Sequence, residues 1–164
     1  AQLNEAVIKE IKYNKDLTFS AKRVLKAINS KTKIIILANP NNPTGTSINK
    51  KDVTKIIKKA RRNNAIVLID EAYCQFSGKT SVPLIKKYDN LLITQTFSKA
   101  FGLAGVRLGY IISNKNKLVK LKLLSLLIQL LYLIPIKIVK KCFDVCDSVR
   151  TSVNKVGMLI NIHA

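Results

Sequence analysis

The stretch "KIIILANPNNPTGTSINKKDVTKIIKKARRNNAIVLID", residues 33–70, decides the fold class of this chain. It begins with an Ile-rich apolar run (33–38) and ends with a second apolar run (65–70), and both runs predict buried parallel strands. Between them lies a loop rich in Asn, Pro, Gly and Thr, followed by apolar residues at helical spacing over 48–63. Asn49 is the expected N-cap of that helix. A strand, a loop, a helix and a strand in this order predict an α/β domain.

The sequence on either side of this unit repeats the same alternation. Downstream, the runs 90–95 and 107–113 predict two more strands. Upstream, residues 19–30 predict a capped amphipathic helix, and the alternating run 6–13 predicts an edge strand. We therefore expect an α/β fold with a mostly parallel sheet and flanking helices.

Polar side chains gather where these strands end, and ligands of such sheets bind at the carboxyl ends of the strands. Asn42 follows the first strand, Asp70 ends the second, and Tyr73 lies three residues further on. The third strand and the start of the fourth add the remaining candidates: Thr96, Ser98, Lys99 and Arg107. Most lysines of the chain lie on polar helix faces or in charged runs. Lys99 instead lies in a small, glycine-containing loop, which favours a chemical role.

This set of side chains matches what pyridoxal 5'-phosphate (PLP) requires. Its aldehyde needs a lysine to form a Schiff base, and its ring nitrogen needs a carboxylate to stay protonated. Its ring oxygen needs a phenol and an amide, and its phosphate needs hydroxyls, backbone N–H groups and an arginine. Taken alone, Asp70 could be a helix N-cap, Tyr73 a half-buried side chain, and Arg107 one arm of a surface ion pair. Their convergence on one edge of a sheet favours the cofactor.

Three motifs occur in this order: "NPNNPTG" (39–45), "VLIDEAY" (67–73) and "TFSKAFGLAGVRLGY" (96–110). Together they resemble the fold-type I PLP-dependent aminotransferases, and most of all the histidinol-phosphate aminotransferase family. The likeness extends over residues 1–116. The resemblance implies that residues 1–156 are an incomplete PLP-binding large domain and that the small domain is absent.

The resemblance implies a role for each candidate residue. Lys99 would hold the cofactor as an internal aldimine and then move the proton between the substrate Cα and the cofactor C4' carbon. Asp70 would pair with the pyridinium nitrogen, and Tyr73 and Asn42 would hydrogen-bond the ring oxygen. Lys99, Asp70 and Tyr73 are therefore the catalytic candidates. The remaining members of the set would bind the phosphate: Thr96, Ser98 and Arg107.

The resemblance also implies a reaction, which is amino transfer between histidinol phosphate and 2-oxoglutarate in histidine biosynthesis. The family enzyme is a cytoplasmic homodimer at full length. The residues that select the substrate are largely outside this chain, so another class I/II aminotransferase or a threonine-phosphate decarboxylase-like enzyme would carry the same motifs. A PLP-binding remnant without turnover is an alternative of a different class.

The formal net charge of +20 favours a nucleic-acid partner. However, 24 of the 29 basic residues are lysines, and they are spread along the chain without an aromatic-interleaved basic patch. We interpret this excess as a coding bias toward Lys, Ile and Asn. We expect no nucleic-acid partner, and a basic nucleic-acid binder is the third alternative.

The last part of the chain departs from the family pattern. The run 123–136 is almost entirely apolar, but it is shorter than the ~20 residues that cross a bilayer, so we expect a buried helix (121–134) and no membrane partner. An interfacial or partner-binding segment and an out-of-frame or decayed stretch are the alternatives for this run. A long helix is expected over 136–156, and the tail 157–164 is unassigned. Three cysteines and a single histidine predict a reducing compartment and no metal site. No basic and apolar leader is visible at the start, which fits a cytoplasmic location.

Overall fold

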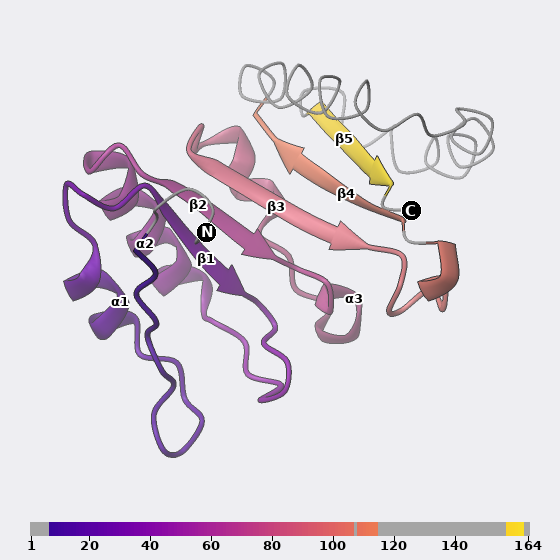
Figure 1. Ribbon diagram of the computed structural model, residues 1–164, viewed down its shortest axis with the longest axis horizontal. Coiled ribbons are helices and arrows are strands. Elements are labelled where there is room, and N and C mark those ends of the chain that lie inside the picture. Colours follow the sequence, from indigo (N-terminus) through magenta and orange to yellow (C-terminus); the bar gives the residue numbers. More distant parts are fainter. Residues whose placement is uncertain (1–6, 107, 115–156, 163–164) are drawn as a thin grey trace.

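The computed structural model describes residues 7–106, 108–114 and 157–162 (Figure 1). Five strands form one sheet in the order of the chain. They are β1 (Ile34–Ala38), β2 (Ile66–Asp70), β3 (Leu91–Thr96), β4 (Leu108–Ser113) and β5 (Gly157–Ile162). The helices are α1 (Ala21–Ala27), α2 (Lys50–Arg62) and α3 (Cys74–Ser77), with short 3-10 turns η2 (Val82–Lys86) and η3 (Ala104–Val106).

The predicted α/β class is confirmed, and the direction of the strands adds one detail. β1, β2 and β3 are parallel, whereas β4 runs antiparallel to β3 and β5 antiparallel to β4. Only residues 97–107 separate β3 from β4, which is too short for the crossover that a parallel pair needs. The start of β4 therefore lies at the same edge of the sheet as the carboxyl end of β3. The tail that the sequence leaves unassigned contributes β5 over Gly157–Ile162.

Helix α2 follows directly from its sequence. Asn49 is its N-cap, as predicted, and the Asn49 Oδ1 atom accepts from the N–H of Asp52 at 2.9 Å. The apolar face of the helix is fully buried in the core: Val53, Ile56, Ile57 and Ala60. The basic residues face away from that core, so α2 packs its apolar face against the sheet and exposes its basic face to solvent.

The core lies on one face of the sheet. Alternate strand residues such as Ile35, Val67 and Ile93 are buried together with the apolar side of α2. On the opposite face, Ile34 and Ile36 of β1 keep 51% and 64% of their surface exposed. This second face is called the open sheet face below; Figure 1 shows the sheet running from β1 to β5 with α1 and α2 beside its first strands.

Two predicted elements near the N-terminus differ from the structure. The edge strand over 6–13 is wrong, because residues 7–13 form no strand and Val7 is 96% exposed. Only Ile11 of this run packs against the core, so the alternating pattern finds no partner strand. The predicted helix over 19–30 is confirmed as the shorter α1, which ends where Asn29 forms a turn with Lys31.

Several predictions fall on residues that the structure does not describe. They are Arg107, the apolar helix over 121–134 and the long helix over 136–156. Within the described ranges, no helix combines the length and the apolar character needed to cross a bilayer. The same ranges contain no group of three His, Cys, Asp or Glu side chains placed to hold a metal ion.

Candidate functional site

The loop after β1 is held against the end of β2. The N–H of Asn39 donates to the carbonyl of Asp70 at 2.9 Å, and Asn39 Oδ1 accepts from the N–H of Ile48 at 2.8 Å. Gly45 adopts φ 66°, a left-handed conformation that favours glycine, and its N–H donates to the carbonyl of Asn41 at 2.8 Å. The loop therefore folds on itself beside the carboxyl end of β2.

Asn42 and Tyr73 meet at this edge although 31 residues separate them. The Nδ2 atom of Asn42 donates to the Tyr73 hydroxyl oxygen at 2.9 Å. Asn42 is exposed and Tyr73 is half-buried, so a ligand can reach both. The two groups predicted to bind the cofactor's ring oxygen are thus direct neighbours.

Asp70 is the last residue of β2, and only one oxygen of its carboxylate accepts hydrogen bonds from described residues. Its Oδ1 atom accepts from the N–H of Ala72 at 3.1 Å and from the hydroxyl of Thr94 at 3.2 Å. Among the described residues, Oδ2 has no hydrogen-bond partner, and the residue is exposed. The helix α3 begins only after Tyr73, so Asp70 is not its N-cap. Asp70 therefore presents an oriented carboxylate oxygen to a ligand.

Lys99 lies in a loop that closes on itself after β3. The N–H of Leu103 donates to the carbonyl of Phe97, and the N–H of Gly102 donates to the carbonyl of Lys99, both at 3.1 Å. Gly102 has φ 66°, which lets the chain turn there. The Lys99 Nζ atom lies 5.5 Å from the centroid of the Tyr73 ring, within cation–π distance. Lys99 thus lies beside the ring of Tyr73, whose hydroxyl contacts Asn42.

Thr96 and Ser98 begin the same loop. The Thr96 hydroxyl accepts from the N–H of Ser98 at 3.1 Å and donates to the carbonyl of Leu108 at 3.2 Å. Thr96 therefore shapes the loop and ties it to β4, while Ser98 is half-buried beside it. The structure describes every predicted site residue except Arg107, and it places the six that it describes at one edge of the sheet.

The sequence prediction missed Glu71, which lies between two of the predicted residues. Its side chain is 0% exposed. Its Oε2 atom accepts from the Thr80 hydroxyl at 2.6 Å and from Gln95 Nε2 at 2.9 Å, and its Oε1 atom accepts from the N–H of Ser81 at 2.6 Å. The available signal was a second carboxylate directly after a buried strand, in "VLIDEAY", to which no role was assigned.

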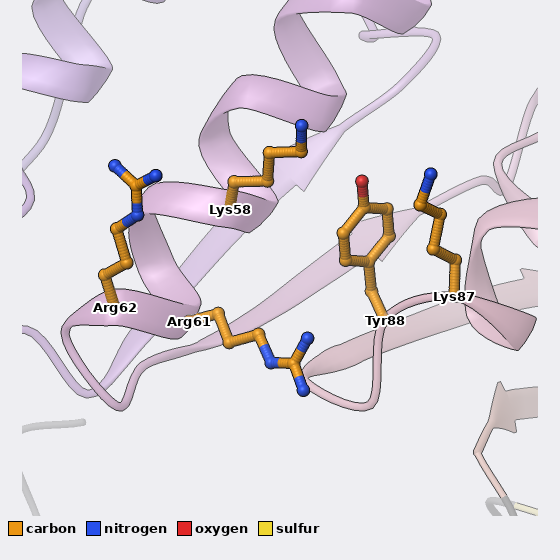
Figure 2. Close-up of a pocket in the computed structure, with 5 residues that line it drawn as sticks. All are labelled: Lys58, Arg61, Arg62, Lys87 and Tyr88. Carbon is orange, nitrogen blue, oxygen red and sulfur yellow. The ribbon is translucent and has the colours of Figure 1, made fainter.

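A separate hollow of about 450 Å³ lies at the opposite edge of the sheet, between the end of α2 and the segment that leads into β3 (Figure 2). It is lined by Lys58, Arg61, Arg62, Lys87 and Tyr88. Its basic residues on α2 lie in or near the last turn, where the helix dipole favours positive charge. Arg61 also pairs with Asp89 at 3.2 Å. The hollow contains none of the predicted site residues.

Comparison with known proteins covers this whole region. The sequence profile of the family "Aminotransferase class I and II" matches residues 1–139. Histidinol-phosphate aminotransferase from Caldanaerobacter subterraneus subsp. tengcongensis is 48% identical over 105 residues, which cover 63% of this chain and 29% of the relative. The protein of the same name from Pyrococcus furiosus is 43% identical over 116 residues, which cover 71% of this chain and 33% of the relative.

A solved structure agrees with these sequence matches. The crystal structure of the histidinol-phosphate aminotransferase from Clostridium acetobutylicum superposes with a TM-score of 0.60 at 31% identity, covering 63% of this chain and 32% of that chain. The chain spans about a third of the length of the curated relatives it matches. The matched region contains all of the predicted site residues, from Asn42 to Arg107. The chain belongs to the class I and II aminotransferase family.

Proposed function

We propose that this chain is part of the PLP-binding large domain of an aminotransferase, and that the whole protein acts as a histidinol-phosphate aminotransferase. The observation that carries the proposal is the contact of Asn42, Tyr73 and Lys99 at the carboxyl edge of the sheet, next to Asp70. Three segments that are far apart in sequence supply the groups that PLP needs. The names of the matched relatives support the choice of substrate.

The residues present fit the cofactor. When bound, PLP supplies an electron sink that stabilises negative charge at the substrate Cα. Asp70 would accept a hydrogen bond from the protonated ring nitrogen through its Oδ2 atom, which has no partner among the described residues. Because Asn42 donates to the Tyr73 oxygen, the phenol keeps its own proton to donate to the ring oxygen. Lys99 would bind the aldehyde carbon and hold or move the proton at the substrate Cα.

The remaining assignments complete this proposal. Ser98, Arg107 and Thr96 would bind the phosphate, and residues 1–156 would belong to the large domain. The substrates would be histidinol phosphate and 2-oxoglutarate, in histidine biosynthesis. The whole protein would be a cytoplasmic homodimer, and the proposal requires no nucleic-acid or membrane partner. The parts of the relatives that this chain does not span would supply the small domain and the groups that select the substrate.

A second candidate function is PLP binding without turnover. Another class I/II aminotransferase, or a threonine-phosphate decarboxylase-like enzyme, would use the same residues on a different substrate. Turnover of histidinol phosphate separates these possibilities once cofactor binding has been established.

The first experiment tests cofactor binding at Lys99. The purified chain is incubated with PLP and reduced with borohydride, and the modified lysine is identified by peptide mass spectrometry. We expect the label to concentrate on Lys99, to disappear in Lys99→Ala, and to persist in Lys79→Ala, which removes another exposed loop lysine. A label that is scattered over many lysines and unchanged in Lys99→Ala would refute the proposal.

A further inference from the structure

Glu71 is a fully buried carboxylate to which the proposed reaction assigns no role. All three of its donors are uncharged: the Thr80 hydroxyl, the Ser81 N–H and the Gln95 amide. Burying a charged group costs free energy unless hydrogen bonds satisfy it, and here both carboxylate oxygens are satisfied. An apolar side chain would fill the same space without needing any of these partners. Three donors directed at one carboxylate therefore indicate that the position of the Glu71 side chain matters.

Gln95 extends this network to the next strand. Its Nε2 atom donates to Glu71 at 2.9 Å, and its Oε1 atom accepts from the Tyr110 hydroxyl at 2.5 Å. The main chain makes a parallel link, because the N–H of Glu71 donates to the carbonyl of Thr94 at 2.8 Å. The turn after β2 is therefore attached to β3 by both its backbone and its side chain, and β3 is attached to β4.

We propose that Glu71 is a positioning residue that sets the turn carrying Asp70 and Tyr73 relative to the strand that leads into Lys99. Asp70 precedes Glu71 directly, and Tyr73 follows it by two residues. Gln95 lies on β3, four residues before Lys99. The hydrogen bond between Glu71 and Gln95 thus connects the turn that carries Asp70 and Tyr73 to the strand that leads into Lys99. This inference rests on the proposed function, since the geometry matters only if these groups share a ligand.

The hydrogen bond between Glu71 and Gln95 can be tested by exchanging the two side chains. Gln95→Glu places two carboxylates where a 2.9 Å hydrogen bond now lies, which is strongly unfavourable. Adding Glu71→Gln restores one amide and one carboxylate, with the charge moved from the turn after β2 to β3. In this double variant the amide introduced at position 71 can accept from Ser81 and donate to the carboxylate at position 95, which can also accept from Tyr110. The hydrogen bond between the turn after β2 and β3 is therefore restored with donor and acceptor exchanged.

The experiment compares the wild type, Gln95→Glu, Glu71→Gln and the double variant. The readouts are urea unfolding of the PLP-free chain, PLP affinity by absorbance titration, and the pH midpoint at which the bound PLP spectrum changes. We expect Gln95→Glu to lower PLP affinity about tenfold or more and to shift the pH midpoint, and the double variant to recover to within about threefold of the wild type. A role in packing alone would leave the pH midpoint unchanged.

The outcomes separate this inference from the proposed function. A folded Gln95→Glu variant that keeps wild-type affinity and pH midpoint would overturn the positioning role, as would a double variant no better than Gln95→Glu. If Gln95→Glu does not fold, Glu71→Met takes its place, and it should bind PLP more weakly than Glu71→Gln. Equal affinities of these two variants would overturn the inference. A wild type without label on Lys99 would refute the proposed function, and the inference with it.

Discussion

Cys74 illustrates how burial changes a single residue next to the site. It opens α3 and is 6% exposed. Burial raises the pKa of its thiol from 9.0 to about 11, and the negative charge of Glu71 adds to this shift. Between these two pH values the folded chain keeps the proton that the unfolded chain has lost. The contribution of Cys74 to stability is therefore complete below pH 9.0 and is lost as the pH rises toward about 11.

We expect iodoacetamide to alkylate Cys74 much more slowly in the native chain than in urea at pH 9, because only the thiolate reacts. Peptide mass spectrometry measures the rate at this cysteine alone. As a control, the unfolding free energy of Cys74→Ala should fall less between pH 9.0 and about 11 than that of the wild type. Equal native and urea rates would show that the thiol is accessible and its pKa ordinary.

The sequence is informative about site residues that stand at strand ends and silent about those that depend on distant partners. The location of Asn42, Asp70 and Lys99 at one edge of the sheet could be predicted, because the ends of parallel strands meet there. The buried position of Glu71 could not, since its hydrogen-bond partner Gln95 lies 24 residues away. A glutamate after a strand is usually solvated, and only the assembled sheet shows that this one is enclosed.

At the scale of elements, α2 depends on its first residue. Asn49→Ala removes the acceptor for the N–H of Asp52 and should lower the free energy of unfolding by about 1 kcal/mol. Urea denaturation measures this loss. Asn49→Ser is the matched control, because serine also caps helices and should stay within a few tenths of a kcal/mol of the wild type. If serine destabilised the chain as much as alanine, the cap would not be the cause.

The strands and α2 could be predicted because each has a strong apolar pattern, but a pattern does not say what an element pairs with. The run 6–13 alternates like a strand, yet residues 7–13 have no neighbouring strand to pair with. The apolar run of β4 likewise does not indicate that this strand is antiparallel to β3. It follows from the short connection after β3, which leaves no room for a crossover.

At the scale of the whole molecule, the open sheet face gives β1 two different sides. Ile35 points into the core, and Ile36 of the same strand is 64% exposed. We expect Ile35→Thr to cost more than ~2 kcal/mol of unfolding free energy and Ile36→Thr less than ~0.5 kcal/mol. Chemical denaturation of both variants measures the difference. Equal losses would mean that the open face is covered in solution.

The overall class was predictable because strands alternating with helices permit few arrangements. The open sheet face was not, since both faces of a buried parallel strand read as one apolar run in the sequence. Ile34 and Ile36 look no different from Ile35 until the layers are assembled. The same holds for the candidate site: the shared edge of its residues could be predicted, but the contact between Asn42 and Tyr73 appears only when β1 and β2 are side by side.

The antiparallel pairing of β3 and β4 also bears on the order in which the site is built during folding. These strands are joined by one short loop, so their pairing requires little loss of chain entropy. The contact between Asn42 and Tyr73 closes a separation of 31 residues and needs β1, α2 and β2 in place. Because local contacts form faster than distant ones, we expect the segment that carries Lys99 to reach its native shape before the segments that supply Asn42 and Tyr73 come together.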